Sequence, residues 1–200
     1  MQKEIINQAI ELFDTHDKWY AYLELANQKD QIINTYLQRV KQPLLKYFVE
    51  NPVEGWVCEP WGDPNYDLRW YLKDFGKKSL AIALGWRFQF HLHLEDTEKF
   101  DSKRIDELLK SEYALILSAF DRIDRQFEPT TKAMESRNYS FDCPLDYSFD
   151  NSQLDKFAWY AGNHTESLVE QIIKKVERFR RDEEITKMLY EINEKSKIIK

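Results

Sequence analysis

Glycine is scarce in this chain, and several short motifs that depend on it are missing. Only five of the 200 residues are glycine. Neither GxxxxGK[ST] nor GxGxxG occurs. Both motifs use glycine to bring backbone N–H groups against phosphates, so nucleotide binding of these two kinds is excluded. A GxSxG nucleophile elbow is missing as well, which argues against the hydrolases built on that turn.

Cysteine and long apolar runs are equally scarce. The two cysteines, Cys58 and Cys143, form no CxxC pair, and disulfide scaffolds carry more cysteine than this. We therefore expect reduced thiols in a cytoplasmic protein. The N-terminal residues include Glu4 and Glu11 and contain no long apolar run. They predict neither a signal peptide nor a membrane span.

The chain is instead rich in acidic and aromatic residues. Its formal net charge is −6, and 14% of its residues are aromatic, six of them Trp. A negative charge disfavours general nucleic-acid binding, whose affinity comes from neutralising phosphates. It favours association with another protein that has a basic surface. The oligomeric state is left open by these features.

Apolar residues recur every three or four positions over residues 1–52, which predicts helices. The first helix is expected over residues 2–14. Asp17 is the predicted N-cap of a second, longer helical stretch. Pro43 should end or kink that stretch near Gln42, or open a short helix of its own. The long stripe consists of Trp19, Leu23, Ala26, Ile33, Leu37, Val40 and Leu44, with Asp30 as one polar interruption.

The apolar period changes from 3.6 to 2 in residues 53–96. From residue 80 to residue 94 every even position is apolar, while the odd positions change from small to polar. This predicts one long strand, or two collinear strands with a bend at Gly85. Residues 68–72 alternate in the same way, and residues 56–58 are a possible third strand. The predicted hairpin register pairs Leu72 with Leu80, Trp70 with Ile82, and Leu68 with Leu84.

The remaining chain is predicted to be mainly helical. We expect a helix over residues 101–128, capped by Asp101 or Ser102, although residues 113–117 are equally compatible with a buried strand. Residues 129–152 look irregular, and residues 153–197 are helical. The predicted fold is a single α+β domain over residues 1–200. N-terminal helices precede a central antiparallel meander with one buried face, and C-terminal helices pack on that face.

The stretch HLHLED, residues 91–96, is the first candidate site. Side chains two apart on a strand share a face, so His91, His93 and Glu95 would project together. Three such ligands suit a zinc ion. The interpretation we favour is a solvated strand face without metal, because no further metal motif supports a site. The same face still predicts a recognition surface, made of Arg87, Gln89, His91, His93 and Glu95.

The second candidate is YSFDCPLDYSFD, residues 139–150, in which a tetrapeptide recurs. Aromatic side chains interleaved with aspartates can stack on arginine and pair with cations of a basic partner. The simpler interpretation, which we favour, is a loop anchored by its aromatic side chains. The predicted contact residues are Tyr139, Asp142, Asp146, Tyr147 and Asp150.

The third candidate is KKVERFRR, residues 174–181. Lys174, Lys175, Arg178 and Arg181 fall on one helical face, which could contact phosphates. More often such a stretch is a solvated helix surface. Neighbouring acidic residues 182–184 balance its charge.

These observations favour an interaction protein over an enzyme. The leading hypothesis is a cytoplasmic protein of accessory, immunity or inhibitor type that binds another macromolecule and has no catalysis or cofactor of its own. The first alternative is a metal-dependent hydrolase using His91 and His93. The second is a nucleic-acid-associated protein using the basic helix at residues 174–181.

Overall fold

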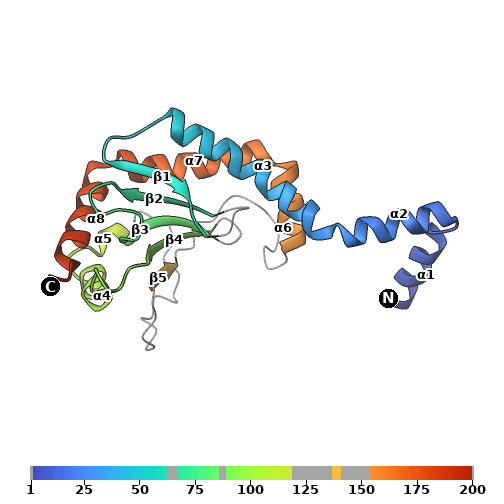
Figure 1. Cartoon of the computed structure of the whole chain (residues 1–200), viewed down its shortest axis with the longest axis horizontal. Helices are drawn as coiled ribbons and strands as arrows, with labels where there is room; N and C mark the ends of the chain where they lie inside the picture. Colours follow the sequence, from blue (N-terminus) through green and yellow to red (C-terminus); the bar gives the residue numbers. More distant parts are fainter. Residues whose placement is uncertain (1, 63–66, 86–88, 119–136, 141–153, 200) are drawn as a thin grey trace.

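The structure is a computed structural model that describes residues 2–62, 67–85, 89–118, 137–140 and 154–199. Within these residues three helices are followed by four strands, two helices, one strand and three helices (Figure 1). The elements are α1 Gln2–Leu12, α2 His16–Asn27, α3 Lys29–Glu50, β1 Trp56–Pro60, β2 Leu68–Leu72, β3 Ala81–Gly85, β4 Gln89–Leu94, α4 Ser102–Lys110, α5 Leu115–Ser118, β5 Arg137–Ser140, α6 Leu154–Asn163, α7 Thr165–Arg181 and α8 Glu183–Ser196. The predicted α+β class is confirmed, and helices both precede and follow the first four strands along the chain.

The described strands form one antiparallel sheet in the order β1-β2-β3-β4-β5. β1 pairs with β2, which confirms the third strand expected upstream of the hairpin. Between β2 and β3, Leu68 lies opposite Leu84, and Trp70 lies opposite Ile82. Both pairs match the predicted register. Gly76, in the connection, has a φ of 78°, a conformation that side chains with a Cβ rarely adopt.

The prediction of a continuous or collinear strand over residues 80–94 is wrong. β3 ends at Gly85, and β4 returns antiparallel to it, with Ile82 opposite Leu92. Every pair in this ladder joins two even or two odd positions. The even residues therefore stay on one face after the chain reverses, and the alternating pattern is the same for a long strand and for this hairpin. The connecting residues 86–88 lie outside the described residues.

The segment predicted to be irregular, residues 129–152, contains a strand. β5 pairs with β4 and places Tyr139 opposite Leu92. It gives backbone partners to β4, which would otherwise be an open sheet edge. Its sequence, RNYS, has no alternating apolar pattern, so the sequence does not predict a strand there. The other residues of 129–152 are outside the described part of the chain.

The even-numbered face of the sheet forms the core against α3 and α8. Phe48 of α3 meets Trp70 edge to face, with ring centroids 5.1 Å apart. The indole N–H of Trp56 donates to the hydroxyl of Thr186 on α8 at 3.3 Å. The buried residues of this face are Trp56, Leu68, Trp70, Leu72, Leu80, Ile82, Leu84, Phe90, Leu92 and Leu94. The predicted packing of helices on this face is confirmed for the described residues, which do not include Phe88.

The opposite face of the sheet is largely buried as well. Arg69, Ala81 and Ala83 are fully buried, and only 7% of His93 is exposed. Trp61, which follows β1, covers part of this face, because its ring contacts that of His93 at an inclined angle with centroids 4.5 Å apart. Polar residues at odd positions therefore do not mark a solvated face here.

Two features of the N-terminal helices differ from the prediction. The N-cap of α2 is Thr15, whose hydroxyl accepts from the Lys18 N–H, and Asp17 lies inside the first turn. An acidic residue is favourable at either place because it faces the positive end of the helix dipole. The helix α3 also continues through Pro43 to Glu50. Burial of the stripe on both sides of Pro43 outweighs the hydrogen bond that proline removes.

The helix predicted for residues 101–128 is interrupted. Asp101 caps α4 as expected, accepting two backbone N–H groups. The helix ends at Lys110, and α5 begins only at Leu115. The Tyr113 hydroxyl in the intervening turn donates to Glu191 of α8 at 2.7 Å, so a tertiary contact holds the break. The alternative strand over residues 113–117 is not formed.

The N-terminal helices extend away from the rest of the molecule. Figure 1 shows α2 continuing outward from α3, with α1 folded back beside it at the far end. Only Gln28 separates α2 from α3. The Ile32 N–H donates to the Gln28 carbonyl at 3.0 Å, which continues the helical hydrogen bonding across the junction. No helix among the described residues is both long enough and apolar enough to cross a membrane.

Candidate functional site

A buried polar cluster occupies the odd-numbered face of the sheet around Arg69. Its guanidinium donates to the carbonyls of Ser79 at 2.7 Å and His93 at 3.0 Å. It also forms an ion pair with Glu95 at 3.3 Å and lies over the ring of Trp61 at 5.4 Å. Burial lowers the pKa of Arg69 to about 10, and the negative charge of Glu95 opposes the shift. The side chain therefore remains a cation at neutral pH.

Position 62, which follows β1, requires glycine. Gly62 has a φ of 57°, and a Cβ at that position would lie 2.2 Å from an Asp67 carboxylate oxygen. Glycine therefore allows the buried Asp67 to lie close to the backbone. The Trp61 N–H also donates to the Asp67 carbonyl at 3.3 Å.

The predicted strand surface is only partly described. His93 is buried against Trp61, and Glu95 is paired with Arg69 and, at 3.5 Å, with Lys78. Both side chains therefore serve internal contacts, and His93 does not fit the interpretation of a solvated strand face. The reason is tertiary, because Trp61 covers this part of the sheet. The side chains of Arg87, Gln89 and His91 lie outside the described residues.

The metal hypothesis stays a prediction for the same reason. Among the side chains that the structure describes, no group of three or more His, Cys, Asp or Glu is arranged to hold a metal ion. His91 is not among those side chains, so the trio of His91, His93 and Glu95 is untested.

The aromatic-acidic segment is also mostly outside the described residues. Of its predicted contact residues, Tyr139 has a described backbone, in β5 opposite Leu92. Asp142, Asp146, Tyr147 and Asp150 are not described, so their role in binding stays a prediction.

The predicted basic face of Lys174, Lys175, Arg178 and Arg181 lies on α7, and Arg181 forms an ion pair within the helix, as does Arg180 beside this face. Glu177 pairs with both Arg180 and Arg181. Arg180 is buried, lies over the ring of Phe48 at 4.6 Å and donates to the Asn51 carbonyl at 3.1 Å. Lys174 is exposed. The surface therefore presents less free positive charge than the sequence KKVERFRR indicates.

Cys58 is not poised for nucleophilic chemistry. Burial raises the pKa of its thiol to about 12, although the charge of Arg180 acts in the opposite direction. A thiol with so high a pKa is almost entirely protonated at neutral pH, and the thiolate is the reactive form. Cys143 lies outside the described residues.

An open groove lies beside the end of α7 and the start of α8. Its walls carry cations and carboxylates together, so the groove has no consistent sign of charge to select a ligand. The groove is lined by Val53, Trp56, Arg181, Glu183, Lys187 and Tyr190, among others.

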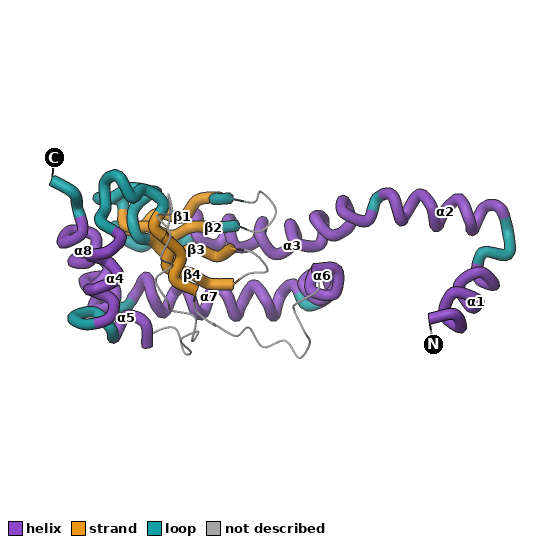
Figure 2. The backbone as a smooth tube through the Cα atoms, turned by 90° about the horizontal axis from the view of Figure 1, so that it is seen from below, coloured by secondary structure: helices purple, strands orange, loops and turns teal. Residues whose placement is uncertain are grey.

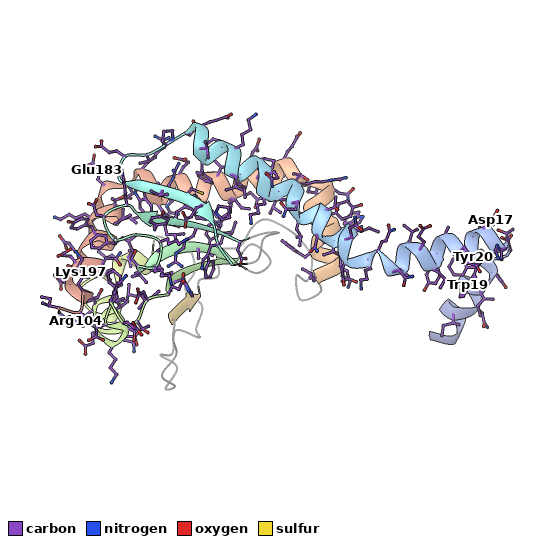
Figure 3. All side chains as sticks on the ribbon, in the orientation of Figure 1. Asp17, Trp19, Tyr20, Arg104, Glu183 and Lys197 are labelled. Atoms are coloured by element: carbon purple, nitrogen blue, oxygen red, sulfur yellow. The ribbon has the colours of Figure 1, made fainter. Side chains whose placement is uncertain are left out.

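Many of the exposed large apolar residues that the structure describes lie on the N-terminal arm, which we define as residues 2–32. No residue of α2 is buried, although this helix carries several large apolar side chains. Tyr20 exposes 56% of its surface and Leu25 exposes 58%. Figure 3 shows Trp19 and Tyr20 at the far end of the arm, remote from the sheet. The exposed large apolar residues of the arm are Ile6, Ile10, Leu12, Trp19, Tyr20, Tyr22, Leu23, Leu25 and Ile32.

A small aromatic cluster gives the arm its shape. Phe13 contacts Tyr22 and Trp19, with ring centroids 4.5 Å and 5.7 Å apart. Trp19 and Tyr22 are themselves 5.8 Å apart. These rings hold the α1–α2 hairpin closed while leaving much of their own surface exposed.

The sequence contains a signal for this surface outside the predicted apolar stripe. The predicted stripe passes through Trp19 and Leu23, but Tyr20 and Leu25 lie off that stripe around the helix. Apolar residues on all sides are typical of a helix that is covered on all sides. In this chain the described residues do not cover it.

Comparison of the chain with protein-family models, with curated proteins and with solved structures gives no match.

Proposed function

We propose that this chain is an interaction protein that binds another protein through its N-terminal arm, in the manner of an accessory, immunity or inhibitor protein without catalysis of its own. The observation that carries the proposal is the complete exposure of α2 despite its aromatic and aliphatic side chains. Contiguous exposed apolar surface on a protein marks an interaction site.

The energetics favour coverage of the arm. Burying one large apolar side chain contributes about 2 kcal/mol. Apart from the ring contacts of Trp19 and Tyr22 with Phe13, the exposed apolar residues of the arm leave most of this contribution unused within the described chain. A partner that buries even three of these side chains gains enough free energy to offset part of the cost of association.

The charge of the arm favours a protein over a phosphate-rich partner. Residues 2–32 contain six acidic and three basic residues. Anionic membrane surfaces attract clusters of Lys and Arg, and nucleic acids do the same. An acidic arm is repelled by both. The partner surface that suits it is apolar with basic residues around it.

Two other functions stay hypotheses. The metal-dependent hydrolase would need the undescribed side chain of His91 beside His93. The nucleic-acid-associated protein would use the α7 face, where Glu177 already pairs with Arg181. No contact among the described residues favours either of them.

Site-specific photocrosslinking tests the proposal. A photoreactive amino acid is placed at Tyr20 on the arm and, as a matched control, at the exposed Ser167 of α7. Both variants are expressed in the cells that produce the protein. We expect Tyr20, and not Ser167, to capture one defined protein, and we expect the purified pair to bind in solution. The same set of products from both positions, or a captured protein that does not bind when purified, would contradict the proposal.

A further inference from the structure

We propose that the partner of the arm is an amphipathic helix that carries a lysine or arginine within its apolar face, and that it docks along the stripe of α2 to pair with Asp30. This inference rests on the proposed function and specifies the chemistry of its partner.

The apolar stripe of α2 continues along α3, where other helices of this chain already cover it. Leu37, Val40 and Leu44 of α3 are buried, and α6 and α7 pack against α3. The approach of α6 is close, since a Cβ on Gly162 would lie 2.3 Å from the ring of Tyr36. Helices of this chain therefore cover the C-terminal half of the stripe.

The coverage by α6 stops near the start of α3. Lys29 reaches Asp155, in the first turn of α6, at 3.9 Å. Beyond that point the stripe continues through Ala26, Leu23 and Trp19, all of them exposed. Figure 2 shows α2 running on from α3 past α6, with α1 as a neighbour only at its far end. A partner helix can extend the packing that α6 begins.

Asp30 follows Leu23 by seven residues and precedes Ile33 by three, so it lies within the apolar stripe. Asp30 is exposed, and no described residue forms an ion pair with it. A partner that covered the stripe with apolar side chains alone would bury this carboxylate without compensation, which is strongly unfavourable. The covering surface therefore needs a cation at this position.

Two of the three lysines of the arm already form ion pairs, and the side chain of the third, Lys3, lies outside the described residues. Lys18 pairs with Asp14 at 2.6 Å, and Lys29 is engaged with Asp155. Glu24 is exposed beside the stripe and adds negative charge. A second copy of this chain would bring another acidic arm against the first. The charges therefore select a basic partner over self-association.

The test uses two designed helical peptides as probes. Both are 18 residues long by design, in the length range of ordinary helices, with the same leucine and alanine face. One has lysines within and beside that face, and the other has glutamates at the same positions. Each peptide is labelled with fluorescein, and its binding to the full chain is followed by anisotropy at low and high salt. Light scattering gives the oligomeric state of the chain alone.

We expect the lysine peptide to bind at least about tenfold more tightly than the glutamate peptide at low salt, which corresponds to about 1.4 kcal/mol. The variant Asp30→Lys should invert this preference, and because Asp30 is exposed, its replacement should leave the fold intact. The matched control Glu183→Lys makes the same charge change at the opposite end of the molecule (Figure 3). It should keep the preference of the unmodified chain.

Several outcomes would overturn the inference. They are equal affinity for the two peptides, an unchanged preference in Asp30→Lys, and no binding of either peptide. A dimer that dissociates in Trp19→Ser would identify a second copy as the occupant. If crosslinking at Tyr20 still captures a defined protein in any of these cases, the proposed function stands and only the basic helix is rejected. If crosslinking captures none, the proposed function fails independently.

Discussion

Single side chains join parts of this chain that lie far apart in the sequence. Asn193 of α8 is fully buried. Its amide accepts from the Leu80 N–H at 2.9 Å and donates to the Leu80 carbonyl at 3.0 Å. This pair of bonds anchors the start of β3 to the last helix. Arg69 acts similarly across the sheet, through the carbonyls of Ser79 and His93. Neither role is visible in the sequence, where both residues are ordinary polar positions.

Replacing Asn193 should therefore destabilise the fold. Asn193→Ala leaves the N–H and the carbonyl of Leu80 buried without their partner, at a cost of about 3 kcal/mol. Urea denaturation measures the change in the free energy of unfolding. The matched control is Asn163→Ala, which removes an exposed amide that donates to the Trp159 carbonyl and should cost less than about 1 kcal/mol. Equal losses in the two variants would show that Asn193 has no special role.

At the scale of elements, the hydrophobic pattern predicts helices and strands well and their boundaries less well. The β2–β3 register follows from alternation, because a shift by one residue would turn the apolar residues to the other face. The β3–β4 reversal does not follow from it, since the pairing preserves the parity of the positions. β5 is formed by pairing with β4, not by its own propensity. Pro43 similarly lies within α3 because tertiary packing overrides local preference.

The proline inside α3 leads to a second stability prediction. Pro43→Ala restores an N–H that can donate to the carbonyl four residues earlier and removes a steric clash. The gain is reduced because alanine makes the unfolded chain more flexible. We expect the net free energy of unfolding to rise by about 1–2 kcal/mol.

Urea denaturation measures this effect too, with Gln42→Ala as the control. Both positions are exposed, and the control should change stability by less than about 0.5 kcal/mol. A loss of stability in Pro43→Ala would mean that a bend at Pro43 is required to pack Leu44 and Phe48.

At the scale of the whole molecule, the chain consists of a packed body and an arm that extends from it (Figure 1). Most of the described large apolar residues of the body are buried, although Val49, Leu115, Trp159, Tyr190, Ile198 and Ile199 are exposed. Those of the arm are nearly all exposed and follow one another along α1 and α2, which makes the arm the candidate interaction site. Of the sites that the sequence predicts, the described residues His93, Glu95 and Arg180 lie on the body and are engaged in internal contacts.

Thermal melts of the whole protein test the remaining metal hypothesis. We expect the melting temperature to be the same with Zn²⁺, Mn²⁺ or EDTA, because His93 packs against Trp61 inside the sheet's odd-numbered face. A metal that binds only the folded state adds about 2.7 kcal/mol at a hundredfold excess over its dissociation constant. If metal raises the melting temperature of the unmodified chain but not that of His91→Ala, the hydrolase hypothesis is supported. His91→Ala is preferable to a His93 variant, since truncating the buried ring would destabilise the protein by itself.

The sequence by itself determined the α+β class, the helical N-terminus, the β2–β3 register and the even-numbered core face. These follow from local periodicity, which depends only on neighbouring residues along the chain. The tertiary structure alone decided that the odd-numbered face is covered, that residues 80–94 reverse, and that the apolar side chains of α2 stay exposed among the described residues. Burial of a side chain depends on which segments, far away in the sequence, pack against it. An apolar residue on the arm and one in the core therefore look the same in the sequence.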